Sequence, residues 1–153
     1  MPSMSDAEIE PRLADPHMCV FSVSRLGKGP VAIPLAYVYR DGRFYLQSSP
    51  DSLHGRLATK RGRATVTIHD EWISAVEASQ WYITAEGPVA YTDDDVRAVM
   101  REILAKDRGE HVADRWLDEW LWPAARNQQV LVLEPERIAG YTFPSRLEDS
   151  SEM

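Results

Sequence analysis

The chain of 153 residues is long enough to bury the core of one domain, and 44% hydrophobic with 27% charged residues is ordinary for a globular protein. A formal net charge of -7 argues against nucleic acid as a partner. No apolar run approaches the ~20 residues that span a bilayer, so a membrane-spanning segment is also excluded.

The two ends of the chain differ in composition from the rest. The first fifteen residues are polar, contain prolines and lack the apolar core of a signal peptide. We therefore expect a flexible N-terminal arm over 1–15, one domain over 16–145 and a disordered acidic tail over 146–153. The single cysteine, Cys19, excludes an internal disulfide and fits a cytoplasmic protein, and we expect it to be a small buried hydrophobe.

Alternating side-chain bulk marks the first strands. Residues 20–24 form a strand candidate that a glycine-containing turn follows. Residues 31–39 carry large side chains at every second position, which predicts one long strand whose two faces differ in bulk. Asp41-Gly42 is a strong signal for a tight hairpin into a strand over 44–47.

A short helix and two further strands are predicted in the middle of the chain. The sequence Ser49-Pro50-Asp51-Ser52 is typical of the start of a helix, here over 50–60. A β-branched run predicts a strand over 64–69, and 81–91 predicts another. Glu86-Gly87-Pro88 within the latter indicates a bulge or a sharp bend.

The apolar period changes to 3.6 residues after these strands. Thr92 and Asp95 resemble a capping box, and apolar residues over 96–104 follow at helical spacing. A second helix begins after a turn near Gly109 and is limited by Pro123. The sequence therefore predicts a pair of helices near the C-terminus.

Two further strands, over 130–133 and 138–143, complete the expected elements. Tight hairpins imply antiparallel pairing, and a sheet of about six antiparallel strands with few helices would close on itself to remove its edges. The residues by themselves thus predict a mainly β, α+β fold in which an antiparallel barrel carries a short helix and a C-terminal helix pair.

Few residues fall into a recognisable catalytic or metal-binding motif. The sequence has no G-x-S-x-G elbow, no G-x-G-x-x-G and no Walker A motif. Its four histidines are dispersed, with no H-x-H or H-E-x-x-H, so we expect no metal site.

The segment 48–63 concentrates hydroxyls and bases in an otherwise acidic chain. Hydroxyls come from Ser48, Ser49 and Ser52, and the first helical turn offers free backbone N–H groups. Such a helix start could cradle a phosphate. The alternative, with equal weight, is a capped surface helix whose bases are solvated. Four bases oppose the single acid Asp51: Arg56, Lys60, Arg61 and Arg63.

The order of these features resembles a known family. A proline-bearing strand and hairpin, VAIPLAYVYRDG, leads into RFYLQSSPDSLHGRLATKRGRATVTI and then WYITAEGPVAYTDD. The combination resembles the FMN-binding split barrel of the pyridoxamine 5'-phosphate oxidase-like superfamily, which includes deazaflavin-dependent reductases. The resemblance extends from about Val20 to Asp94, and more loosely to Phe143. It implies a split β-barrel and a homodimer with two cofactors at the dimer interface.

The resemblance also implies which residues hold the cofactor phosphate. The phosphate-binding hydroxyls fall on Ser48 and Ser52, and the basic ligands fall on Leu53, His54 and Arg56. Leu53 cannot bind phosphate, and His54 replaces a lysine and is mostly uncharged at neutral pH. A neighbouring base would then compensate, with two candidates: Arg61 and Arg63.

The flavin ring, by the same resemblance, lies against the proline-bearing strand, here Ile33, Pro34 and Leu35. Gln47 lies near the phosphate turn, from which its side chain could reach the cofactor. Three tryptophans either cover the ring by stacking or, as is more common for such a stripe, form helix core: Trp116, Trp120 and Trp122.

These features together predict a cytoplasmic, homodimeric oxidoreductase. It would transfer hydride or electrons to or from a small organic substrate through FMN or, as the alternative, the deazaflavin F420. The runner-up from another class is a non-catalytic or haem-binding split-barrel protein. Neither nucleic acid nor a membrane is expected as a partner, and no catalytic acid or base is assigned.

Overall fold

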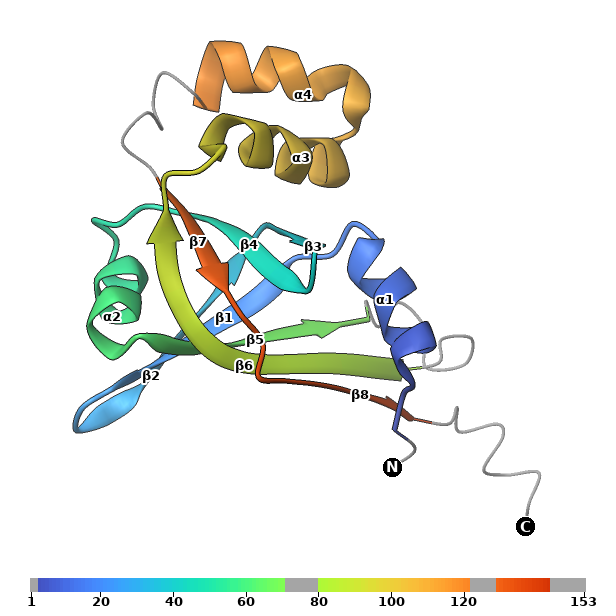
Figure 1. Cartoon of the computed structure of the whole chain (residues 1–153), viewed down its shortest axis with the longest axis vertical. Coiled ribbons are helices and arrows are strands. Elements are labelled where there is room, and N and C mark those ends of the chain that lie inside the picture. The colour runs from blue at the N-terminus through green and yellow to red at the C-terminus, as the bar shows by residue number, and fades with distance from the viewer. Residues whose placement is uncertain (1–2, 71–79, 122–128, 144–153) are drawn as a thin grey trace.

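The computed structural model describes residues 3–70, 80–121 and 129–143. Within these ranges the chain forms an eight-stranded antiparallel sheet, four α-helices and a short π-helical segment (Figure 1). In chain order the elements are α1 (Asp6–Ala14), β1 (Cys19–Arg25), β2 (Lys28–Leu35), β3 (Tyr37–Arg40), β4 (Arg43–Ser48), α2 (Leu53–Arg61), β5 (Arg63–His69), β6 (Gln80–Thr92), α3 (Val96–Arg108), α4 (Glu110–Trp116), η1 (Leu117–Leu121), β7 (Gln129–Leu133) and β8 (Arg137–Phe143).

The sheet has the strand order β2-β1-β5-β6-β7-β4-β3, with β8 also paired to β6, and β2 and β3 are its open ends. The long strand β6 joins the two halves of the barrel, because it pairs with β5 as far as Pro88 and with β7 from Val89 onward. Figure 1 shows this strand curving strongly between the two halves. The expected split-barrel α+β fold is thus confirmed, with eight strands rather than about six.

One expectation for the strands needs correction and another is confirmed. The predicted single strand over 31–39 ends at Ala36, where β2, which pairs with β1, gives way to β3, which pairs with β4. The alternation also breaks there, because Tyr37 and Val38 are both buried. The bend expected at Glu86-Gly87-Pro88 is confirmed: β6 continues through this segment but curves there and changes its partner from β5 to β7 between Pro88 and Val89. The carbonyl oxygen of Glu134 lies where a Cβ of Gly87 would be.

Residues 6–14, expected to belong to a flexible arm, form the helix α1 instead. Ile9 and Leu13 are four residues apart, so they share one helix face, and both are buried. The Tyr37 hydroxyl donates a hydrogen bond to the carbonyl oxygen of Leu13 at 3.2 Å. The mostly polar composition of this segment did not predict a helix, yet α1 covers one end of the barrel with its buried face (Figure 1).

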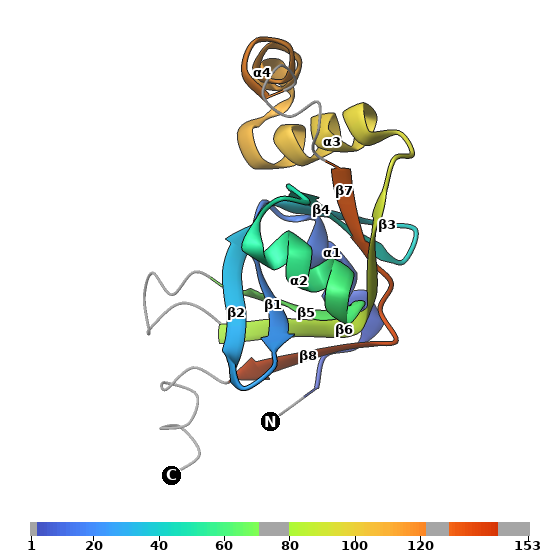
Figure 2. The same ribbon diagram turned by 90° about the vertical axis from the view of Figure 1, so that its left-hand side faces the viewer.

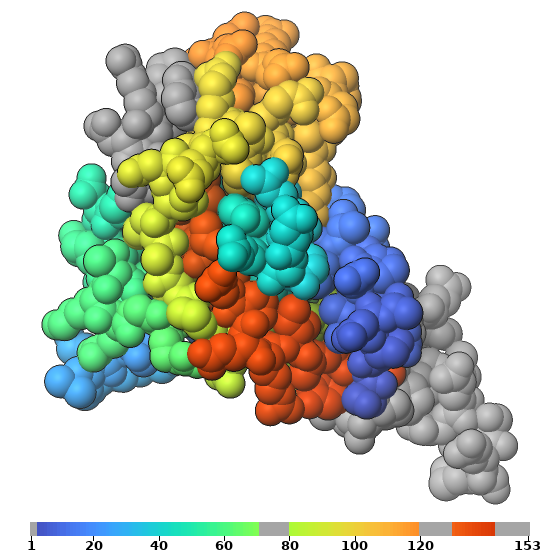
Figure 3. Space-filling model, in the orientation of Figure 1, coloured from blue at the N-terminus to red at the C-terminus, as the bar shows by residue number. Residues whose placement is uncertain are grey.

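The helix α3 covers β3, β4 and β7, and α4 packs against α3 on the side away from the sheet, so that a second, smaller core forms around α3 (Figures 1 and 3). The expected capping box is not formed: α3 begins at Val96, after Asp95 with a positive φ of 50°. Thr92 instead accepts a hydrogen bond from the backbone N–H of Asp94. The apolar face itself is confirmed, since four residues at helical spacing are buried: Val99, Met100, Ile103 and Leu104.

The main core lies inside the barrel and includes Cys19, which is fully buried as expected. Burial raises the pKa of its thiol to about 12. At the opposite end from α1, the helix α2 lies across the barrel (Figure 2). No described helix is long and apolar enough to cross a membrane.

Candidate functional site

The turn between β4 and α2 is organised by serine side chains. Ser52 is the N-cap of α2: its hydroxyl accepts a hydrogen bond from the N–H of Gly55 at 3.0 Å and donates one to the carbonyl oxygen of Ser49 at 2.6 Å. The helix therefore begins at Leu53 rather than at residue 50. The Ser52 side chain, expected to face a phosphate, closes the helix start instead.

Ser48, at the end of β4, is the centre of a hydrogen-bonded cluster. Its hydroxyl oxygen lies 2.9 Å from His54 Nε2 and 3.0 Å from the Tyr91 hydroxyl oxygen. His54 Nε2 also lies 3.2 Å from the Ser52 hydroxyl oxygen. Ser48 is only 4% exposed, so these partners replace the water that its hydroxyl would otherwise bind. We call Ser48, Ser52, His54 and Tyr91 the serine cluster.

The serine cluster is uncharged at neutral pH. Burial lowers the pKa of His54, whose ring packs edge-on against Phe21 with the ring centroids 6.1 Å apart. Burial also raises the pKa of Tyr91, an effect that the Ser48 hydrogen bond opposes and the charge of Asp51 reinforces. Both side chains therefore stay neutral, and the cluster presents no cation to an anionic ligand.

The expected basic ligands are engaged elsewhere or exposed. The Arg56 guanidinium donates a hydrogen bond to the carbonyl oxygen of Asp51 at 3.1 Å. Arg63 forms a two-pronged ion pair with Glu136, with N–O distances of 2.8 and 2.7 Å. The Leu53 side chain is 49% exposed. Since the hydroxyls bind one another and the histidine is neutral, the residues around α2 do not fit a phosphate in this arrangement.

The other residues predicted for the cofactor lie outside the serine cluster. Ile33 and Leu35 are half-buried on β2 and pack against the main core, so their side chains face inward. Pro34 faces outward and pairs with Val20. Gln47 lies on β4 opposite Val130. Its assignment and that of the β2 residues stay predictions, because no hydrogen bond links any of these side chains to the cluster among the described residues.

The tryptophans, which were expected either to stack on the flavin ring or to form helix core, and the histidines, for which no metal site was expected, can now be placed. Trp116 on α4 is 37% exposed and packs under the Arg108 guanidinium, 4.8 Å from its ring centroid, so it lies at the surface. The Trp120 side chain and Trp122 lie outside the described residues. In the described ranges, no three His, Cys, Asp or Glu side chains gather in a group that could hold a metal ion.

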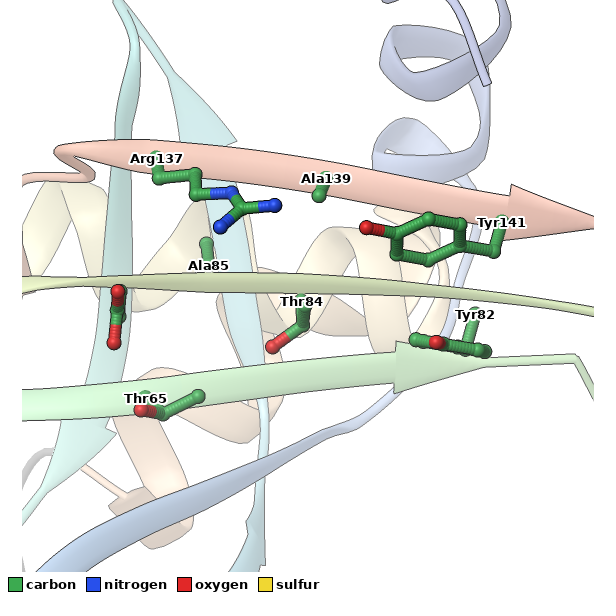
Figure 4. Close-up of a pocket in the computed structure, with 8 residues that line it drawn as sticks. Thr65, Tyr82, Thr84, Ala85, Arg137, Ala139 and Tyr141 are labelled. Carbon is green, nitrogen blue, oxygen red and sulfur yellow. The ribbon is translucent and has the colours of Figure 1, made fainter. Parts of the chain in front are cut away.

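A cavity of about 340 Å³ opens on the outer face of β5, β6 and β8 (Figure 4). The rings of Tyr82 and Tyr141 pack at one end, with centroids 5.2 Å apart and planes tilted by 38°. Figure 4 shows the Arg137 guanidinium and the Tyr141 ring extending toward each other from the two sides of Ala139. The remaining lining side chains are Thr65, Thr84, Ala85 and Glu86.

These cavity residues are absent from the sequence-based site, although the alternation of 81–85 contained a signal. Trp81 and Ile83 are buried, so Tyr82 and Thr84 must face outward. What the sequence did not provide was their partner strand, since Tyr141 and Ala139 lie more than fifty residues later.

A larger cavity of about 530 Å³ lies between α3, α4 and η1, but both of the arginines that line it are already paired. Arg101 contacts Asp114 at 2.7 Å, and Arg97 is paired with Asp118. The cavity therefore offers a ligand no arginine that is not already held by a carboxylate among the described residues.

Comparison with known proteins places the fold. The family model described as "Pyridoxamine 5'-phosphate oxidase" matches residues 5–142 of this sequence. None of the curated proteins matches it.

Three solved structures illustrate the similarity. An FAD-binding protein from Mesorhizobium loti is 17% identical with a TM-score of 0.65, over 94% of this chain and 98% of that one. The haem storage protein from Vibrio cholerae is 14% identical with a TM-score of 0.65, over 94% and 97% of the two chains. An F420 reductase is 14% identical with a TM-score of 0.62, over 84% and 94%. At these identities the likeness shows a shared fold.

Proposed function

Because the chain belongs to the pyridoxamine 5'-phosphate oxidase family, we propose that it binds a flavin-type cofactor and acts as an oxidoreductase on a small organic substrate. The observation that carries the proposal is the family match over residues 5–142, together with the FAD-binding protein and the F420 reductase among its structural neighbours. The bound cofactor would supply the redox chemistry, and the protein would bind and orient it.

FMN is the first choice of cofactor and the deazaflavin F420 the alternative. Both carry a planar three-ring system and differ in the atom at the redox centre and in the tail. Since the serine cluster does not fit a phosphate, binding would depend on contacts to the ring system. Both FMN and F420 would then be bound mainly through their ring systems.

We also propose that the protein is a homodimer. The outer face of β1, β5, β6 and β8 supports this, because its central side chains are uncharged and lack a covering layer within the described residues. One row across this face consists of Pro34, Val20, Thr67, Thr84 and Ala139. Thr84 and Ala139 also line the cavity on β5, β6 and β8, so in such a dimer the cavity would lie between the two chains. Light scattering coupled to gel filtration should give about twice the mass of one chain, and a monomer at all concentrations would contradict this proposal.

Haem binding is the second candidate, and the haem storage protein among the structural neighbours supports it. Against it, the Nε2 atom of His54 is bonded within the serine cluster and could ligate iron only if that cluster opened.

The test is a visible absorption spectrum of the purified protein, repeated after adding FMN, F420 or haemin and desalting. Retention of FMN or F420 would support the proposed function and choose the cofactor. Retention of haemin alone, with a Soret band, would favour the second candidate. Retention of none of them would contradict both.

A further inference from the structure

We propose that the cavity on β5, β6 and β8 binds the flavin-type ring by its imide edge, with Arg137 donating to a ring carbonyl and Glu86 accepting the ring N–H. This inference rests on the proposed function and adds to it a site that is distinct from the turn at α2. The ligand that this cavity would recognise is a planar heterocycle with adjacent carbonyl and N–H groups.

The register of the sheet brings the required side chains onto one face. Glu86 pairs directly with Arg137, and on its other side with Thr65. Tyr82 pairs with Tyr141 at the other end of the cavity. Directly paired residues share a face of the sheet, so the two tyrosines and the charged pair all point outward together.

The spacing suits a fused three-ring system. Tyr82 and Glu86 are four residues apart on β6, which is about 13 Å along a strand. Between them lie the small side chains of Thr84 and Ala139, which leave the hollow that Figure 4 shows. A cavity of about 340 Å³ lies at the small end of the usual ~300–1,000 Å³ for ligand pockets. It therefore suits a ring system lying along the strand, with any tail left outside.

The charges of the cavity favour a neutral, hydrogen-bonding edge over an anion. Arg137 and Glu86 form no ion pair with any described residue. The nearby Arg63 is already held by Glu136. A donor and an acceptor of opposite charge thus stand side by side with no net charge between them. An imide edge presents the complementary acceptor and donor, whereas a phosphate would meet the Glu86 carboxylate.

The aromatic end of the cavity supplies the apolar contact. Tyr82 and Tyr141 pack against each other at 5.2 Å and are only partly buried, which leaves ring surface for a ligand. Aromatic surfaces of this kind gain from offset or edge-on packing against a further ring. The cavity therefore has a stacking end and a hydrogen-bonding end, as a ring with one polar edge requires.

The experiment measures lumiflavin binding by fluorescence titration, with N3-methyl-lumiflavin as the blocked probe. We expect lumiflavin to bind the wild-type protein and the methylated ring to bind at least tenfold more weakly, because it has no N–H for Glu86. Arg137→Gln and Glu86→Ala should each weaken lumiflavin binding about tenfold. Arg43→Gln is the matched control, since Arg43 is an exposed arginine paired with Glu134 on the other half of the barrel.

The outcomes separate this inference from the proposed function. If lumiflavin and FMN bind but N3-methylation and both cavity variants change nothing, the cavity assignment is wrong and the proposed function stands. If the wild-type protein binds no flavin or deazaflavin at all, both are wrong. The methylated probe is tested on the wild-type chain, so the result does not depend on whether a variant folds.

Discussion

The Ser48 hydroxyl oxygen lies 3.0 Å from the Tyr91 hydroxyl oxygen, and this contact joins the end of β4 to β6, 43 residues further along the chain. Ser48 also contacts His54, so a single buried hydroxyl connects two strands and the first turn of α2. The side chains that a sequence reading assigns to a phosphate thus hold the helix against the barrel.

Removing either partner of this contact should destabilise the fold. Ser48→Ala and Tyr91→Phe should each lower the free energy of unfolding by about 1–3 kcal/mol, because each leaves a buried polar atom without its partner. The double variant should cost less than the sum of the two, with a coupling of about 0.5–1.5 kcal/mol. Urea denaturation of all four proteins measures this, and strictly additive costs would show that the two hydroxyls do not interact.

Close packing at Gly55 provides a second measure of how tightly α2 is held. A Cβ at this position would contact the Ser49 carbonyl oxygen, the Tyr91 hydroxyl and the Ser52 hydroxyl. Gly55→Ala should therefore lower the free energy of unfolding by about 1–3 kcal/mol, despite the better helix propensity of alanine. The control is Gly29→Ala, where a Cβ meets nothing within 4 Å. Equal thermal midpoints for the two variants would be the contrary result.

The lowered pKa of His54 makes stability depend on pH on the acid side. Burial holds this pKa below its ordinary value of 6.5, so the folded protein binds fewer protons than the unfolded chain just below that pH. The contribution of neutral His54 to the free energy of unfolding is complete above about pH 6.5 and is lost as the pH falls toward the pKa of His54 in the folded protein. His54→Gln should reduce this loss, whereas His111→Gln, at an exposed position, should not. Urea denaturation at several pH values between about 5 and 7.5 compares the slopes, and identical slopes for wild type and His54→Gln would contradict the assignment.

Lys106 should make the free energy of unfolding depend on pH on the alkaline side. Its Nζ donates to the Tyr37 carbonyl oxygen at 3.3 Å and lies 3.5 Å from the centroid of the Tyr37 ring. Burial lowers its pKa from 10.5 to about 8, so between these values the unfolded chain binds more protons and the free energy of unfolding rises with pH.

Replacing this lysine isolates its contribution. Lys106→Met should flatten the rise in unfolding free energy between pH 8 and 10.5, while Lys60→Met, at an exposed position on α2, should leave it unchanged. A rise of the same size in Lys106→Met would assign the pH dependence to another group.

The role of the α2 turn in phosphate binding can be tested directly. Arg56 is exposed and bonded to the Asp51 carbonyl oxygen, and the serine hydroxyls are engaged with one another. Riboflavin and FMN should therefore bind with affinities within about twofold, a difference of ~0.4 kcal/mol, and Arg56→Ala should alter neither. A preference for FMN of tenfold or more that Arg56→Ala abolishes would show that the turn opens to hold the phosphate.

Several elements follow from the sequence for local reasons. The Asp41-Gly42 hairpin, the β-branched strand β5 and the apolar face of α3 are set by neighbouring residues, so turn chemistry and periodicity predict them. Other features depend on partners far along the chain. The break at Ala36 exists because β2 and β3 pair with different strands, and α1 exists because the barrel end buries Ile9 and Leu13.

Composition, periodicity and turn chemistry were enough to predict the β-rich class, the short helix after β4 and the hydroxyls and bases that cluster near that helix. The contacts of those groups depend on long-range folding, because a hydroxyl binds whichever partner the fold places within about 3 Å. For Ser48 that partner is Tyr91 on a distant strand, and for Tyr82 it is Tyr141 on β8. Long-range strand pairing therefore places the hydroxyls expected to bind a phosphate in a structural contact and forms the cavity that we assign to the ring.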